Sequence, residues 1–218
     1  MVKKTFTLAL LWVLALLGAS AYAQTKPGWQ QYSVDDGRLT FRLPNTLTPY
    51  FFKDKTIKAT PLGDGTVAVS GSEMLLFVPK SEADRDLEGF EVTSAVALIV
   101  GDRESGKGLG IAVNLLRKSG TMRSLASWGI KKAIRKHSKG DEVELVDAGN
   151  FAVVTVAGEE AVTWPMTIRD EEGREADARV YMLEHSGRGY VLVLMTQKGV
   201  TGLTQLDGRE ILASLTYR

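Results

Sequence analysis

The sequence predicts an α+β fold in which a mainly antiparallel β-sheet is covered by helices. Short apolar segments bounded by Gly, Asp and Pro occur in both halves of the chain, and they are typical of strands joined by tight turns. Residues 122–137 instead repeat their apolar side chains every three to four positions, as a helix does. The strands come in runs and do not alternate with helices, which favours antiparallel pairing.

The first 23 residues have the composition of a secretory signal peptide. Two lysines near the start precede an apolar run at residues 6–17, and an Ala-Tyr-Ala triplet ends at Ala23. The run of about 12 residues is shorter than the roughly 20 that a membrane-spanning helix needs. We expect cleavage after Ala23 and export to the bacterial periplasm, with an uncleaved anchor as the alternative. Residues 24–218 are expected to form a single domain.

Cysteine usage agrees with this expectation. The chain contains no cysteine, so neither a disulfide nor a lipidated residue at the cleavage site is expected. A chain of this length can bury enough apolar surface to fold without disulfides. We therefore expect a soluble mature protein with no membrane span.

Strands are predicted along most of residues 29–100. Two short strands flank the turn signal Asp35-Asp36-Gly37. The acidic segment SEADRDLEGFE, residues 81–91, is expected to be a surface loop. The remaining predicted strands are KTIKAT, TVAVSG, EMLLFVP and VTSAVALIV.

Residues 101–116 are predicted to form a hairpin tip, GDRESGKG, followed by a strand, LGIAVNLL. The tip has the G-x-x-x-x-G-K spacing of a phosphate-binding loop. However, Gly108 stands where Ser or Thr would hold magnesium, and a following strand leaves no helix N-terminus to receive phosphates. We therefore expect no nucleotide or other cofactor here.

The central helix is expected to bury one stripe of side chains and to end before Gly140, which suits a C-terminal cap. The predicted buried stripe consists of Met122, Leu125, Ala126, Gly129, Ile130, Ala133, Ile134 and His137.

The rest of the chain returns to strands. Glu171-Glu172-Gly173 and residues 186–189 are the clearest hairpin turns, and residues 203–215 form a moderately helical C-terminal segment. The predicted strands are EVELVD, FAVVTVAG, EAVTWPMTIRD, READARVYMLE and GYVLVLMTQ.

This order of segments resembles the Mog1/PsbP-like fold family, which includes the small exported bacterial DcrB-type proteins. The resemblance is carried by YSVDDGRLTFRLP, by the helix SLASWGIKKAIRK, by the hairpins from Gly158 to Thr196 and by EILASLTYR at the end. It implies an α/β/α sandwich around a mainly antiparallel sheet, with a central and a C-terminal helix. Members more often resemble binding and assembly modules than enzymes. Residues 50–90 fit poorly and look like an insertion or lengthened hairpins, and no site residue can be transferred.

Charge is segregated along the chain. Residues 105–140 contain nine Lys and Arg and no acid, whereas residues 141–184 contain twelve acids and three arginines. Without Lys3 and Lys4, 25 basic residues face 26 acidic ones, a net charge of −1. This balance argues against nucleic-acid binding, which usually needs a strongly basic domain.

A basic outer face of the central helix is the main candidate site. A tryptophan among cations on this face suits binding to a protein partner with an acidic surface. The protein would then act as an immunity protein or an envelope assembly factor. The apolar side of the helix is expected to be needed for the sheet, which leaves only weak attraction to anionic lipid headgroups. A solvated surface without a function is the alternative. The candidate partner-binding residues are Trp128, Lys131, Lys132, Arg135 and Lys136.

Catalytic and metal-binding chemistry is not indicated. His137 and His185 are the only histidines, and neither has a paired ligand nearby in sequence. No nucleophile motif or zinc motif occurs. We expect a non-enzymatic protein with no catalytic residue, no metal and no cofactor.

Binding of a small ligand or a lipid is the second functional hypothesis. It places a pocket between the sheet and the central helix, with Trp29, Trp164 and Tyr181 as possible lining residues. Pro165 lies in a strand-like run and is expected at an edge or a bulge, which leaves strand addition open as a binding mode.

Overall fold

The computed structural model describes residues 28–50, 58–70, 74–84, 93–100, 103–137, 143–156, 158–199 and 205–217. The expected signal peptide lies outside these residues, as do parts of the segment 50–90. Within them, no helix is long and apolar enough to cross a membrane.

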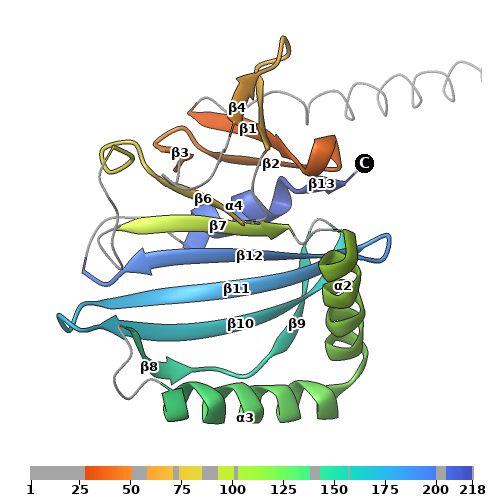
Figure 1. Ribbon diagram of the computed structural model, residues 1–218, viewed down its shortest axis with the longest axis vertical. Coiled ribbons are helices and arrows are strands. Elements are labelled where there is room, and N and C mark those ends of the chain that lie inside the picture. The colour runs from red at the N-terminus through yellow and green to blue at the C-terminus, as the bar shows by residue number, and fades with distance from the viewer. Residues whose placement is uncertain are drawn as a thin grey trace, which may run out of the picture.

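The fold is α+β, as predicted, but its strands form two sheets instead of one (Figure 1). The smaller sheet has the order β13-β2-β1-β5-β4, and β1 and β5 are parallel neighbours. It is built from β1 (Trp29–Val34), β2 (Leu39–Pro44), β4 (Lys58–Pro61), β5 (Thr66–Ser70) and β13 (Thr216–Tyr217).

The larger sheet has the order β3-β6-β7-β12-β11-β10-β8, and β9 also pairs with β10. Its neighbouring strands are antiparallel, and it contains the two predicted hairpins at Gly173 and Gly187. Its strands are β3 (Leu47–Pro49), β6 (Met74–Pro79), β7 (Ser94–Val100), β8 (Val143–Ala148), β9 (Ala152–Val156), β10 (Glu159–Asp170), β11 (Glu175–His185) and β12 (Arg188–Gln197).

The helices lie on opposite faces of the larger sheet. Helix α2 (Arg103–Lys118) crosses β12, β11 and β10, and α3 (Gly120–His137) follows it and lies along β8 (Figure 1). Helix α4 (Gln205–Ala213) contributes Ile211 and Leu212 to the core on the other face. The central helix and the C-terminal helix were both predicted, whereas α2 was not.

The predicted hairpin tip and strand at residues 101–116 are wrong, because α2 occupies residues 103–118. Leu109, Val113 and Leu116 lie one helical turn apart and pack into the cluster beneath α2 and α3. Three glycines and a β-branched Ile and Val give this segment low helix propensity, and tertiary packing overrides that preference.

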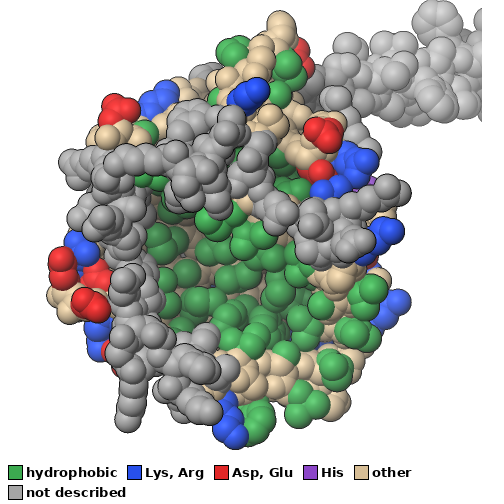
Figure 2. All heavy atoms as spheres, viewed as in Figure 1, with side chains coloured by type: hydrophobic (Ala, Val, Ile, Leu, Met, Phe, Trp, Pro, Cys, Tyr) green, Lys and Arg blue, Asp and Glu red, His purple; other side chains and the backbone are tan. Residues whose placement is uncertain are grey.

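The main core lies between the smaller sheet, α4 and one face of the larger sheet. Tyr32, Phe41 and Phe77 contact one another there with ring centroids 4.9 to 6.0 Å apart. A second cluster, around Phe151 and Trp164, lies on the opposite face beneath α2 and α3. Between the helices and β7, that face is hollowed and covered by hydrophobic side chains (Figure 2).

Candidate functional site

A groove of about 910 Å³ lies between α4 and the larger sheet, on the face opposite α2. Its volume falls in the range of small-molecule sites, which are about 300–1,000 Å³. Its walls and floor come from β9, β10, β11, β12 and α4. Among the lining residues are Val154, Val156, Thr163, Pro165, Thr167, Asp177, Arg179, Tyr181, Leu194, Thr196, Arg209 and Leu212.

The strand register explains why these side chains share one floor. Residues directly opposite in an antiparallel pair point to the same face of the sheet. Arg179 of β11 lies opposite Pro165 of β10 and Leu194 of β12. Tyr181 and Asp177 are two positions away on either side of Arg179, so they point to the same face.

Arg179 is an exposed cation on this floor, between a proline and a leucine. The described part of the chain provides it with neither an ion pair nor a hydrogen bond. By contrast, Arg169 and Arg174 at the end of the same hairpin are bound to Glu175 and Asp170. A guanidinium without a partner, beside apolar walls, is available to an anionic ligand group.

Thr163 adds a second polar group to the groove. Its side chain is 8% exposed, and its Oγ1 has no hydrogen-bond partner among the residues that the structure describes. A buried hydroxyl without a partner costs free energy, so such a group is explained when a ligand or a water completes its hydrogen bond. Thr163 lies opposite Tyr181, one diagonal step from Arg179.

The apolar wall on the helix side depends on a close approach of α4 to the sheet. A Cβ atom on Gly208 would lie 3.0 Å from Cδ1 of Leu194. Leu212 follows Gly208 by one helical turn and faces the main core. The groove therefore combines apolar side chains with several polar and charged ones.

Charged groups at the open end of the groove are paired among themselves. Lys198 Nζ lies 3.0 Å from Glu175 Oε2 and 3.7 Å from Asp177 Oδ1. Hydrogen bonds from Arg169 and Lys198 hold the pKa of Glu175 below its usual value. Thr167 Oγ1 donates to Asp177 Oδ1 at 2.7 Å. These groups fix the rim, whereas Arg179 remains available.

The three aromatic residues expected near a pocket have different locations. Tyr181 lines the groove, although the helix beside it is α4 and not the central helix. Trp164 packs on the other face, where its Nε1 donates to the carbonyl oxygen of Gly149 at 2.9 Å. Trp29 is half-buried against the main core.

Pro165 lies at a break in strand pairing. Pro165 and Trp164 are the two positions between the last residue that β9 pairs and the first that β8 pairs on the same side of β10. Its carbonyl oxygen accepts a hydrogen bond from Gly149 N at 2.9 Å. β10 is not an edge strand, since it has neighbours on both sides, but Pro165 occupies a local gap in the pairing on one side. The missing N–H of Pro165 therefore leaves no ladder hydrogen bond unmade.

The basic face of α3 is only partly described. Trp128 is 63% exposed, and Lys132 Nζ lies 4.9 Å from the centroid of its ring. Lys131 is half-buried and donates to Oδ1 of Asn150 at 3.3 Å. The side chains of Arg135 and Lys136 lie outside the described residues. A role for these five residues in binding a partner stays a prediction.

The predicted buried stripe of this helix is wrong for Met122 and Leu125, which are exposed. Two other members of the stripe, Ala126 and Ile130, face the sheet as predicted, and they are joined by the buried Ser127. The buried Ser127 Oγ donates to the carbonyl oxygen of Arg123 at 2.8 Å and accepts from Phe151 N at 3.1 Å. This pair of bonds fixes the rotation of α3.

His185 has a partner that its sequence neighbours did not indicate. Its Nδ1 lies 2.8 Å from Glu159 Oε1, and its ring stacks on Tyr217 with centroids 4.4 Å apart. Within the described ranges, no group of three His, Cys, Asp or Glu residues could hold a metal ion. The side chain of His137 lies outside those ranges.

Comparison with known proteins extends to the fold alone. No family model matches the chain, and no curated protein is significantly similar to it. Cyanobacterial PsbP (CyanoP) from Synechocystis is 14% identical, with a TM-score of 0.49 over 89% of this chain and 95% of that chain. The Ran-binding protein Mog1p of Saccharomyces cerevisiae is 9% identical, with a TM-score of 0.40 over 87% and 95%.

A Bacteroides thetaiotaomicron protein is also 9% identical, with a TM-score of 0.46 over 87% of this chain. This chain spans about half of that protein, since the match covers 48% of it. All three structural similarities are weak, with TM-scores below 0.5. At these identities the similarity carries no statement about function.

Proposed function

We propose that the protein is a non-enzymatic binding protein, which holds an amphiphile with an anionic group in the groove between α4 and the larger sheet. The observation that carries this proposal is Arg179, a cation without a described partner between the apolar side chains of Pro165 and Leu194. Val154, Val156, Tyr181 and the helix side of the groove would contact the apolar part of the ligand. The guanidinium would bind its carboxylate or phosphate.

Thr163 supports the same ligand class. Its buried hydroxyl can donate to an anionic oxygen or accept from a ligand hydroxyl. We favour the groove on this face because the guanidinium of Arg179 and the hydroxyl of Thr163 lie close together in it. A largely apolar pocket with a few convergent polar groups is the usual form of a ligand site.

The proposal places the protein in the periplasm, on the basis of the signal peptide expected at residues 1–23. Mass spectrometry of the protein recovered from an envelope fraction tests this part. A mature N-terminus at Gln24 supports export, whereas an intact Met1 in the cytoplasmic fraction contradicts it.

Binding of a fluorescent fatty acid tests the ligand class. Cis-parinaric acid and its methyl ester have the same chain, but only the acid carries a charge. We expect the native protein to bind the acid more tightly, and Arg179→Gln to weaken acid binding by about tenfold or more, since charge-assisted hydrogen bonds contribute about 1.5–3 kcal/mol. Arg38→Gln, which changes an exposed arginine in the turn before β2, is the matched control.

Thr163→Val separates a role in ligand binding from a role in stability. Because the hydroxyl has no partner in the fold, its removal is expected to leave the free energy of unfolding unchanged or slightly raised. It is expected to weaken binding of the acid. Equal affinities of acid and ester for the native protein and for Arg179→Gln would overturn the proposed site.

The interaction module predicted from the sequence, with an acidic protein partner bound at the basic helix face or at a sheet edge, remains a prediction. The exposure of Trp128 beside Lys132 is compatible with an interaction at this face.

A further inference from the structure

Exposed apolar side chains are concentrated on α2 and α3. Of the seven large hydrophobic residues that are exposed in the described part of the chain, five lie on these two helices. Their exposed fractions run from 42% to 65%, and they are Ile111, Leu115, Met122, Leu125 and Trp128. Single exposed hydrophobic residues are common, but such a grouping indicates an interaction surface.

Lysines frame these side chains in a regular pattern. On α2, Lys107, Ile111, Leu115 and Lys118 follow one another at four, four and three positions, so they share one outer stripe. On α3, Leu125, Trp128 and Lys132 do the same. We call these seven residues, together with Met122, the helical ridge.

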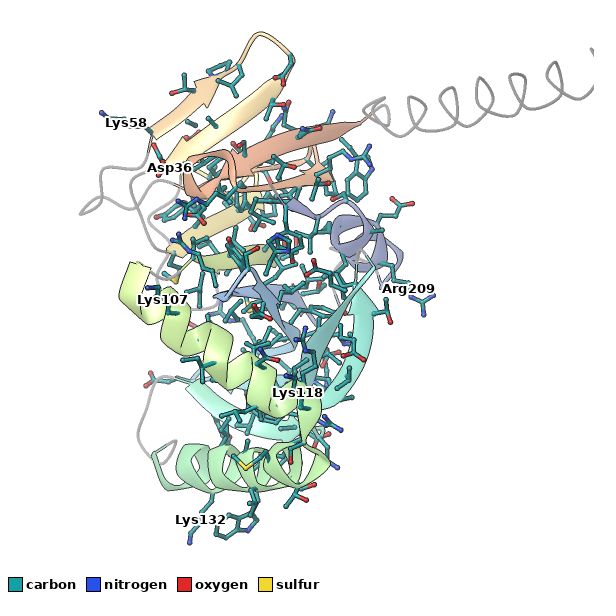
Figure 3. All side chains as sticks on the ribbon, turned by 90° about the vertical axis from the view of Figure 1, so that its right-hand side faces the viewer. Asp36, Lys58, Lys107, Lys118, Lys132 and Arg209 are labelled. Atoms are coloured by element: carbon teal, nitrogen blue, oxygen red, sulfur yellow. The ribbon has the colours of Figure 1, made fainter. Side chains whose placement is uncertain are left out.

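The two helices of the ridge are held together at their junction. Arg123 Nη1 donates to the carbonyl oxygens of Leu116 and Arg117 at 2.7 and 2.8 Å, so α3 is bound to the last turn of α2. Lys107 and Lys118 project from α2 and Lys132 projects from α3 (Figure 3). Arg209, beside the proposed ligand groove, lies on the other side of the molecule (Figure 3).

The charge of the ridge is of one sign. No Asp or Glu occurs in the sequence from residue 105 to residue 140. The described side chains Lys107, Lys118 and Lys132 are exposed. Arg117 points elsewhere, toward Glu184 and Glu160 on the larger sheet. The ridge therefore combines apolar side chains and a tryptophan with cations, which is the composition of surfaces that bind at the lipid–water interface.

We propose that the helical ridge docks the protein on an anionic lipid membrane. Leu125 and Trp128 would enter the boundary between headgroups and acyl chains, and the lysines would bind lipid phosphates. The charge of the ridge is complementary to an anionic membrane. Each lysine near such a surface contributes favourable binding energy, and no acidic residue of the ridge repels the lipid phosphates. This surface goes beyond the proposed ligand groove and does not depend on it.

Vesicle co-sedimentation tests the proposal with the chain from Gln24 to Arg218. Every residue of the three described core clusters lies between Trp29 and Tyr217, and circular dichroism first confirms that each variant is folded. The vesicles are phosphatidylcholine alone or phosphatidylcholine with phosphatidylglycerol. One variant, Leu125→Ser with Trp128→Ser, removes apolar contact, and another, Lys118→Glu with Lys132→Glu, reverses charge.

Matched controls come from the other end of the molecule. Leu62→Ser changes an exposed leucine beside β4, and Lys58→Glu with Lys80→Glu reverses two exposed lysines outside the ridge. Lys58 lies on β4, well away from α2 and α3 (Figure 3).

We expect the native chain to sediment with the phosphatidylglycerol vesicles and to bind pure phosphatidylcholine poorly. The variant with Lys118→Glu and Lys132→Glu is expected to lose about tenfold or more in partitioning, since each lysine near an anionic surface contributes about 1 kcal/mol. The variant with Leu125→Ser and Trp128→Ser is also expected to bind less, because it removes apolar surface that would enter the interface. Added salt should weaken the native binding. Both controls should bind like the native chain.

Two results would overturn the docking proposal. One is equal sedimentation of the native chain and both ridge variants. The other is an absence of vesicle binding, together with self-association that Leu125→Ser and Trp128→Ser abolish, which would assign the ridge to a protein interface. Neither result affects the fatty-acid assay, so failure of the ridge and failure of the groove are distinguishable.

Discussion

Gly110 of α2 and Gly189 of β12 are in backbone-to-backbone contact. A Cβ atom on Gly189 would lie 2.6 Å from the nitrogen of Gly110, and one on Gly110 would lie 2.6 Å from the carbonyl oxygen of Gly187. No side chain fits at either position without a shift of the main chain. This contact sets how closely α2 approaches the turn of the β11–β12 hairpin, where Gly187 follows Gly110 by 77 residues in the sequence.

Gly110→Ala is therefore expected to destabilise the fold by about 1–3 kcal/mol, as overpacking does. Gly108→Ala, on the exposed side of the same helix with no atom within 4 Å of the new Cβ, is the matched control. It should stabilise the protein by about 0.5–1 kcal/mol, because alanine has the higher helix propensity. Urea unfolding midpoints measure both changes. Two alanine variants of equal stability would contradict the tight contact.

Ser127→Ala is expected to cost about 1–3 kcal/mol, because it leaves the buried N–H of Phe151 without an acceptor. Ser124, one turn earlier and exposed, donates only to the carbonyl oxygen of Gly120 within the same helix. Ser124→Ala should change stability by less than about 0.5 kcal/mol. Thermal and urea unfolding compare the pair, and a similar loss in both would show that Ser127 does not position α3.

The free energy of unfolding is expected to fall in acid as the carboxylates at the end of the β10–β11 hairpin become protonated. Hydrogen bonds from Arg169 and Lys198 lower the pKa of Glu175. For Asp170, burial acts to raise the pKa, but the hydrogen bonds and charge of Arg174 outweigh it and the net pKa is lowered.

For both carboxylates the folded pKa lies below the unfolded one, so their contribution is fully present above the usual Glu value of 4.5. It is lost as the pH falls through the lower folded values. Glu175→Gln should reduce stability at neutral pH and flatten this acid loss, measured as the free energy of unfolding against pH. An unchanged slope would contradict the assignment.

Stability is expected to fall at alkaline pH through the ionisation of Tyr190. Burial, and then the neighbouring Asp35, raises the pKa of Tyr190 to about 12, and its hydroxyl donates to Asp35 Oδ2 at 3.1 Å. Because the folded pKa is raised, the stability it contributes is present below the usual value of 10.0 and is lost as the pH rises toward 12. Tyr190→Phe should remove part of this loss, which tyrosinate absorbance and unfolding at rising pH both report.

Local signals in the sequence were sufficient to predict most of the strands and helix α3. Asp36, Gly37, Gly173 and Gly187 lie in turns with positive φ, where such residues are favoured, so the turns could be located without tertiary information. The period of the apolar residues likewise identified α3 as a helix. Its exact rotation could not be predicted, because the apolar stripe is wide enough to include Met122 and Leu125, which are exposed, as well as Ala126 and Ile130, which face the sheet.

The segment of α2 could not be predicted from local sequence for a different reason. Gly106, Gly108 and Gly110 suggest a turn, and the alternation around Ile111 and Val113 suggests a strand. The helix is stabilised by the hairpin at Gly187 and by the sheet beneath it, both distant in sequence. Arg179 was missed in the same way, since only the strand register places it between Pro165 and Leu194.

The last strand, β13, pairs with β2, joining Thr216 and Tyr217 to Thr40 and Leu39. Ser214 also accepts a hydrogen bond from Arg42 N at 2.8 Å. The smaller sheet, which includes the first strands of the chain, is therefore complete only when residues 214–217 are in place. Contacts of this sequence separation form slowly, so the smaller sheet is expected to be the last part of the fold to be completed during synthesis.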